Sequence, residues 1–204
     1  MDRAGRQIKY ACTVLFLLVC LARVPAQESG SPLDTSGQTS IDGHTAPYLI
    51  RHLPVNAFPQ LPSAVQGALT RRGCLIPQTY EAHRPENIVR ASLERKGSSD
   101  WAVLCSVDGT VSLLVFLASA NGEPAVLASA SETSRLQAHG SSSVLGFNWA
   151  IDPASPERVH EARLDMRYPP PRPDHDALAD SIVDRKTVYR FYSRGTWTIL
   201  ETED

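Results

Sequence analysis

Two cysteines, Cys74 and Cys105, constrain the fold more than any other pair of residues, because a bond between them would join points 31 positions apart. The other two cysteines of the chain lie within an N-terminal segment that has the pattern of a secretory signal. Without that segment the exported chain keeps an even pair, and exported proteins form and retain disulfides. We therefore predict a Cys74–Cys105 disulfide. Free thiols or metal ligands are the alternatives, and zinc is disfavoured because the chain has no CxxC spacing.

The first 26 residues have the three parts of a signal peptide. A basic start precedes an apolar run over residues 11–22, and Val24 and Ala26 occupy positions −3 and −1 of a cleavage site. The alternatives are a membrane anchor and a lipidated Cys20. The apolar run has 12 residues, whereas a spanning helix needs about 20, and the residue before Cys20 is not the small one that lipidation requires. We predict cleavage after Ala26 and a periplasmic or secreted protein, of more bacterial than eukaryotic type.

The charge of the mature chain bears on its partners. Cleavage would remove four basic residues and one acidic residue, which leaves 16 basic and 21 acidic residues and a formal charge of −5. A partner such as nucleic acid or an anionic membrane selects for a basic surface. We therefore expect no nucleic-acid partner and no membrane attachment after cleavage. The expected partner is a protein or a component of the cell envelope.

The remaining chain divides into two parts by composition. Residues 27–47 are rich in Ser, Gly, Thr and Asp with few large apolar residues, which predicts a disordered linker. Residues 48–204 are long enough for a single globular domain. Within this part, Ser63 and Ser155 are expected to be the N-caps of two short helices, and Gly73 to end the first.

Short apolar segments with tight turns between them predict β-hairpins over much of the same domain. Asp108-Gly109 and Arg194-Gly195 separate strands of this kind, and residues 111–118 are apolar enough to be covered on both faces. The predicted fold class is therefore α+β, with mostly antiparallel β-hairpins, two short helices and one disulfide. The hairpins headed by Asp100 and Asp180 also look alike, either as an internal repeat or by chance.

Several motifs resemble those of a group of uncharacterised exported bacterial proteins, and they cover most of residues 58–200. They are Arg72–Gln78 (RGCLIPQ), Pro85–Val89 (PENIV), Asp100–Ser106 (DWAVLCS), His175-Asp176 followed by Asp180, and the aromatic segment Tyr189–Trp197. The resemblance implies a shared fold and no particular activity. The hairpins with a leading Asp are also distantly similar to FG-GAP or VCBS-type repeats, which bind calcium in propeller blades, although this chain has too few repeats to close a propeller.

The segment PDHDALAD, residues 173–180, is the candidate metal or functional cluster. Asp174, Asp176 and Asp180 occupy relative positions 1, 3 and 7, and His175 lies among them. Calcium loops place oxygen ligands at alternate positions. Here, however, position 5 is Leu178 and the glycine of the sharp bend is missing. Calcium is thus a possible cofactor, and the alternative is a polar turn in which Asp180 caps a hairpin.

Sequence motifs for catalysis are missing elsewhere in the chain. There is no GxSxG, phosphate loop or dinucleotide fingerprint, and the six histidines are scattered without HxH or HExxH spacing, so most are expected at the surface. We therefore predict no catalytic residue, and a small exported binding or cell-envelope domain that is not an enzyme. The alternative is a metal-assisted hydrolase that uses Asp174, Asp176 and Asp180.

Overall fold

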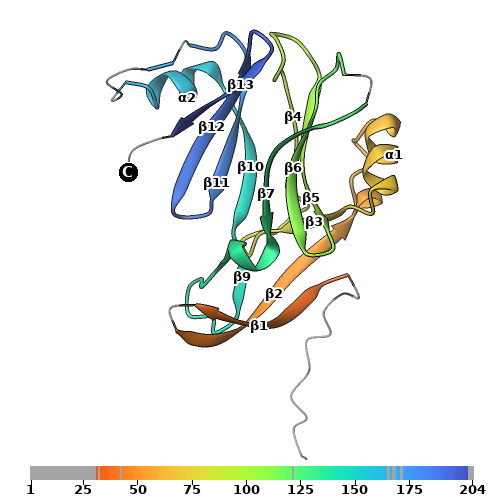
Figure 1. Ribbon diagram of the computed structural model, residues 1–204, viewed down its shortest axis with the longest axis vertical. Helices are drawn as coiled ribbons and strands as arrows, with labels where there is room; N and C mark the ends of the chain where they lie inside the picture. Colours follow the sequence, from red (N-terminus) through yellow and green to blue (C-terminus); the bar gives the residue numbers. More distant parts are fainter. Residues whose placement is uncertain are drawn as a thin grey trace, which may run out of the picture.

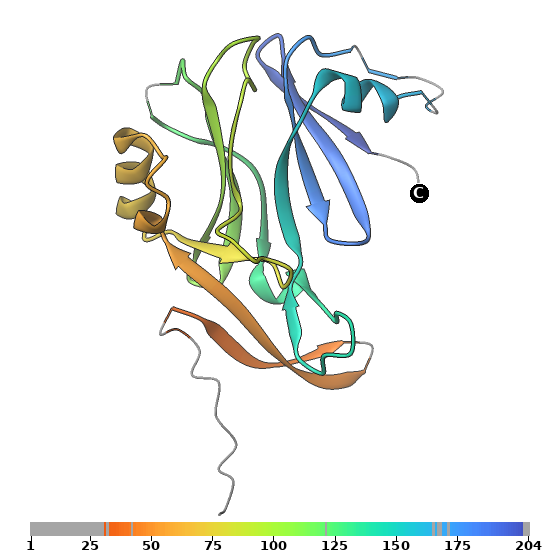
Figure 2. The same ribbon diagram turned by 180° about the vertical axis from the view of Figure 1, so that it is seen from behind.

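The computed structural model describes residues 31, 33–41, 43–120, 122–164, 166, 169–170 and 172–201. Two β-sheets pack against each other, and one helix covers the outer face of each sheet, so that α1 and α2 lie on opposite sides of the molecule (Figures 1 and 2). The protein is therefore mostly β, with two short helices, as expected. The segment predicted as a signal peptide, residues 1–26, lies outside the described residues.

The larger sheet has nine strands. Seven lie in the order β7-β6-β5-β3-β2-β9-β8, and β1 pairs with β2 and β4 with β5. The strands are β1 (Thr35–Ile41), β2 (His44–Pro54), β3 (Leu75–Gln78), β4 (Ile88–Ala91), β5 (Asp100–Val107), β6 (Thr110–Phe116), β7 (Ala125–Ser131), β8 (Leu136–Gln137) and β9 (Leu145–Phe147). Because β2 and β9 run parallel, with Tyr48 opposite Leu145, this sheet is mixed and not purely antiparallel.

The smaller sheet is antiparallel and has four strands in chain order. They are β10 (Trp149–Ala154), β11 (Ala177–Ile182), β12 (Lys186–Ser193) and β13 (Thr196–Glu201). The helices are α1 (Ser63–Arg71) and α2 (Pro156–Glu161), and two 3-10 turns, η1 (Val55–Ala57) and η2 (Glu132–Arg135), follow β2 and β7.

Three apolar clusters explain why β5 and β6 are apolar on both faces. The central cluster fills the space between the sheets and includes Leu104 of β5, Leu113 of β6 and Trp149 of β10. A second cluster lies between the larger sheet and α1, and a third lies between the smaller sheet and α2. Side chains alternate across a strand. The strands covered on both sides therefore carry continuous apolar sequence.

Turn and cap residues behave largely as their chemistry predicts. Asp108 and Gly109 both have positive φ, 48° and 75°, in the β5–β6 hairpin. Such values suit the tight hairpin turns that match strand twist. Ser155 caps α2 by accepting a hydrogen bond from the backbone N–H of Arg158. Helix α1 differs from expectation, because its N-cap is Pro62 and Ser63 is already its first residue.

The disordered linker predicted over residues 27–47 is wrong for residues 35–41 and 44–47. Strand β1 pairs along its whole length with β2, from Thr35 opposite Ile50 to Ile41 opposite His44. Most β1 side chains are exposed. A strand of this kind is held by backbone hydrogen bonds, which form whatever the side chains are. The composition of this segment, which is poor in large apolar residues, therefore gave no sign of strand β1.

Candidate functional site

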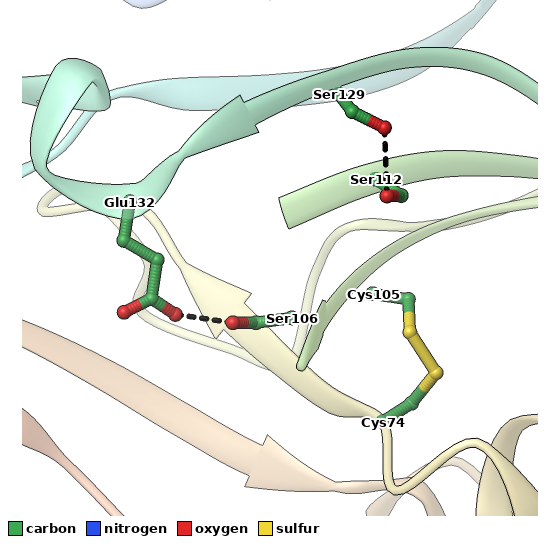
Figure 3. The surroundings of a disulfide bond; sticks show 6 residues. All are labelled: Cys74, Cys105, Ser106, Ser112, Ser129 and Glu132. Atoms are coloured by element: carbon green, nitrogen blue, oxygen red, sulfur yellow. Dashed lines mark hydrogen bonds between the residues drawn. A yellow bond between two sulfur atoms is a disulfide. The ribbon is translucent and has the colours of Figure 1, made fainter. Parts of the chain in front are cut away.

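The predicted disulfide is present, and it lies where two neighbouring strands of the larger sheet share the fewest residue pairs. Cys74 and Cys105 are bonded, with their Cα atoms 5.1 Å apart (Figure 3). Strand β3 is paired with β5 through one residue pair, Leu75 and Ser106, each of which directly follows one of the cysteines. We call this junction the seam. The disulfide thus fastens two strands where the hydrogen-bonded ladder between them is shortest.

A buried polar cluster lies next to the seam and joins β2, β5 and η2. Glu132 of η2 accepts hydrogen bonds at Oε1 from His52 Nε2 of β2, at 2.7 Å, and from the hydroxyl of Ser106 of β5, and Figure 3 shows the second of these bonds. All three side chains are buried. Burial alone would raise the pKa of Glu132, but the two hydrogen bonds together lower it below its usual value. The cluster therefore holds an ionised carboxylate inside the protein.

The cluster borders an open cavity of about 560 Å³, whose lining also includes Arg71 and Arg72 at the end of α1. Nucleophilic catalysis requires a hydroxyl next to a base. Here the hydroxyl of Ser106 and the imidazole of His52 both face the same carboxylate oxygen, so the imidazole does not receive the hydroxyl proton. The arrangement joins β2, β5 and η2, and we interpret it as structural.

A second site contains the aromatic stack of Tyr80 and His139. The two rings are parallel within 6°, with centroids 4.5 Å apart. The Tyr80 hydroxyl donates to Asp184 at 2.9 Å and accepts from the amide of Gln137 at 3.4 Å, while its backbone N–H donates to Phe147 at 2.9 Å. The Tyr80 side chain is therefore fixed from several sides, although it is only partly buried.

Two open pockets, of about 600 and 500 Å³, adjoin each other at this stack because Glu81 and Asp184 line both. We call the pair the Tyr80 groove. The first pocket contains Tyr80 and His139, and the second contains Asp152. Burial raises the pKa of Tyr80 to about 12, with a further contribution from Asp184. Burial, together with the neighbouring charge of Glu86, also raises the pKa of Asp152. The groove is therefore polar and offers fixed hydrogen-bonding groups.

Of the predicted cluster, the structure brings Asp174 and His175 together. Nδ1 of His175 lies 2.8 Å from Asp174, and Nε2 lies 2.9 Å from the carbonyl oxygen of Tyr192. Both ring nitrogens thus lie within hydrogen-bonding distance of an oxygen atom. The hydrogen bond to His175 lowers the pKa of Asp174, whose side chain is 89 % exposed. The pair anchors the segment before β11 to the end of β12.

The other two members of the cluster have separate partners. Asp176 accepts a hydrogen bond from the backbone N–H of Ser92 at 2.9 Å. Asp180 accepts from the indole N–H of Trp149 at 2.6 Å and from Arg190 at 2.8 Å, inside the protein. Among the residues that the structure describes, no group of three or more His, Cys, Asp or Glu side chains is arranged to hold a metal ion.

The two aspartates that head similar hairpins have different roles. Asp100 is fully buried and accepts hydrogen bonds from three backbone N–H groups, those of Leu93, Glu94 and Ala118. It therefore caps the loops on either side of its hairpin. Asp180 instead neutralises a partly buried arginine, Arg190, and fixes the indole of Trp149. The likeness of the two segments in sequence does not extend to the function of these side chains.

Sequence reasoning missed the Tyr80 groove because its parts are far apart in the chain. Tyr80 and Glu81 follow β3, Gln137 and His139 come more than fifty residues later, and Asp184 lies in the β11–β12 turn. No motif with fixed spacing joins them. Sequence reasoning also placed most histidines at the surface, whereas His52 and His175 are buried. In the described part of the chain, no helix combines the length and the apolar character needed to cross a membrane.

Comparison of the chain with protein-family models, with curated proteins and with solved structures found no match, so no family is assigned.

Proposed function

We propose that this protein is a small exported bacterial domain that binds a component of the cell envelope without catalysing a reaction. The signal-like N-terminus and the resemblance to exported bacterial proteins support export. The disulfide adds to this support, because such bonds persist in oxidising compartments. The buried His52–Glu132–Ser106 cluster is better suited to fastening strands than to nucleophilic chemistry, which favours binding over catalysis.

The Tyr80 groove is the proposed binding surface, and the fixed position of Tyr80 carries the proposal. Its ring is stacked on His139 and its hydroxyl is held by Asp184 and Gln137 before any ligand arrives. Groups that are already ordered lose little conformational entropy on binding. Fixed polar groups beside an aromatic pair, at the wall of an open groove, are therefore the basis for placing the ligand there.

Co-sedimentation with purified peptidoglycan sacculi and with purified outer-membrane vesicles tests this function. The protein expressed as residues 1–204 is expected to sediment with one of them, and Tyr80→Ala is expected to reduce the bound fraction. Tyr192→Ala is the matched control, because Tyr192 is also partly exposed and pairs with another aromatic ring, Trp197, on the smaller sheet. No sedimentation with either material, or equal loss in both variants, would contradict the proposal.

The metal-assisted hydrolase stays a prediction from sequence. A thermal-melting scan in calcium, zinc and EDTA tests it. A calcium-dependent rise in melting temperature that Asp176→Ala and Asp180→Ala both abolish would favour that function, since a bound ion stabilises the folded state.

A further inference from the structure

The aromatic stack of the Tyr80 groove rests on a position where only glycine fits. A Cβ atom added to Gly146 would lie 2.5 Å from Cβ of Tyr80 and 3.4 Å from the ring of His139. Real Cβ atoms do not approach other atoms so closely, so a side chain at position 146 would displace Tyr80. The glycine lets the Tyr80–His139 pair lie directly on strand β9, which makes the stack a rigid platform at the wall of the pocket.

The face of an aromatic ring carries partial negative charge. It therefore attracts the slightly positive hydrogens of C–H groups. A ligand that presents a flat face of C–H groups, with polar groups around its edge, would suit such a platform. The side chains of Tyr80 and His139 are both partly exposed and both line the first pocket. This supplies the apolar half of a recognition site in a groove that is otherwise polar.

The charges of the groove do not select a strongly charged ligand. Its lining includes three carboxylates, those of Glu81, Asp152 and Asp184, and two cations, those of Arg185 and Lys186. Donors and acceptors of both kinds therefore lie side by side. A hydroxyl group both donates and accepts, and so it can pair with either kind. A ligand rich in hydroxyl groups matches this mixture better than a polycation or a polyanion does.

The polar groups are also held in fixed directions. The Tyr80 hydroxyl uses its proton on Asp184, and the Gln137 amide that donates to Tyr80 also donates to the carbonyl oxygen of Val183 at 3.2 Å. Its own amide oxygen accepts from Asn148 at 3.2 Å. This chain of hydrogen bonds runs from the buried amides to the groove. Fixed directions favour ligands whose hydroxyl groups are themselves fixed by a ring.

From the platform, the mixed charges and the fixed polar groups together, we propose that the Tyr80 groove binds a neutral oligosaccharide. One sugar ring stacks on the Tyr80–His139 platform, and the hydroxyl groups of the next sugar reach the pocket that contains Asp152. Two adjoining pockets of about 600 and 500 Å³ suit an oligosaccharide better than a single sugar. This inference rests on the proposed binding function and names the chemical class of the ligand.

The test is titration of the full-length protein with chitotetraose, cellotetraose and maltotetraose, monitored by isothermal calorimetry and by two-dimensional NMR of backbone amides. Tetralysine is the charged probe. At least one oligosaccharide is expected to bind and to shift the amide signals of Tyr80, His139 and Asp184. Tyr80→Ala should weaken that binding about 2- to 10-fold, the range that one aromatic contact contributes, and Tyr192→Ala should not.

Three further variants keep the outcome clear. His139→Ala removes the platform by a second route if Tyr80→Ala does not fold, and Tyr80→Phe should retain binding through the ring. Asp184→Asn removes one charge but keeps an acceptor, so it should change oligosaccharide binding less than about 3-fold, whereas a cationic ligand would lose more. Binding of tetralysine but of no oligosaccharide would overturn the ligand class and leave the groove as a binding site. Failure of all four probes, with sedimentation that still depends on Tyr80, would also overturn the class. If all four probes fail and the protein also shows no sedimentation that depends on Tyr80, the binding function itself would be overturned.

Discussion

Removing the disulfide should destabilise the protein by an amount that follows from its position in the chain. The bond closes a loop between residues 31 positions apart. In the chain-entropy model, a loop of this length raises the free energy of unfolding by about 3.7 kcal/mol. For a domain of this size each kcal/mol shifts the melting temperature by about 2–4 °C. Cys74→Ala with Cys105→Ala is therefore expected to lower the melting temperature by about 7–15 °C.

The seam adds a local effect to this global one. Because one residue pair, Leu75 and Ser106, joins β3 to β5, whereas seven pairs join β5 to β6, loss of the bond should increase hydrogen exchange in β3 first. Regions with few hydrogen bonds open at lower free energy than the rest of a fold. Urea unfolding of the oxidised protein, the reduced protein and the double variant measures the change in the free energy of unfolding. Hydrogen exchange measures the local opening at the seam.

A matched control lies beside the disulfide in Figure 3. Ser112 and Ser129 form a hydrogen bond of 2.8 Å between β6 and β7, which are already joined by six residue pairs. Ser112→Ala should therefore lower the free energy of unfolding by about 1 kcal/mol or less. An oxidised and a reduced protein that differ by less than 1 kcal/mol, at equal urea dependence, would refute the reasoning. Two alkylatable thiols in the purified protein, seen by mass spectrometry, would refute the bond itself.

Three other measurements address the two polar sites. Because the pKa of Glu132 is lowered in the folded protein, its carboxylate stabilises the fold above about pH 4.5, and this stabilisation is lost as the pH falls through the folded-state value. The melting temperature of the wild type should thus fall more steeply below pH 4.5 than that of Glu132→Gln, and equal slopes would contradict the assignment. Burial raises the pKa of Tyr80 to about 12 from 10.0, so stability should fall between these two pH values. The phenolate absorbance missing from Tyr80→Phe should likewise develop near pH 12, and a midpoint near 10 would contradict the raised pKa of Tyr80. Gly146→Ala should lower the free energy of unfolding by about 1–3 kcal/mol through overpacking against Tyr80. Gly67→Ala, within helix α1, should raise it by about 0.5–1 kcal/mol, and similar effects at the two glycines would show that no close contact exists at position 146.

The features that sequence predicted well are local or involve a single pair of residues. The Asp108-Gly109 hairpin follows from the backbone freedom of two adjacent residues, and the strands on either side of it follow from their apolar sequence. The disulfide was predictable because, once Cys12 and Cys20 are assigned to the signal-like N-terminal segment, Cys74 and Cys105 allow one pairing only. For each of these features the determining residues are adjacent or unique.

The features that sequence did not predict depend on pairing between distant segments. Strand β1 has almost no apolar signal, since it is joined to β2 mainly through its backbone. The Tyr80 groove requires the loop after β3, the β8–β9 connection and the β11–β12 turn to meet, and no spacing rule in the sequence encodes that meeting. The buried Glu132 was equally hidden, because its partners come from β2 and β5 and a glutamate in sequence gives no sign of burial.

The parallel pairing of β2 with β9 has a consequence for the order in which the chain folds. Tyr48 and Leu49 pair with Leu145 and Gly146, almost one hundred residues later. Contacts between residues so distant in sequence form late and slow the folding of β-rich proteins. During synthesis, the edge of β2 at Tyr48 and Leu49 therefore stays unpaired until β9 has been made. An unpaired edge is a template for association with other chains, so the growing chain is most exposed to aggregation just before residue 145 emerges.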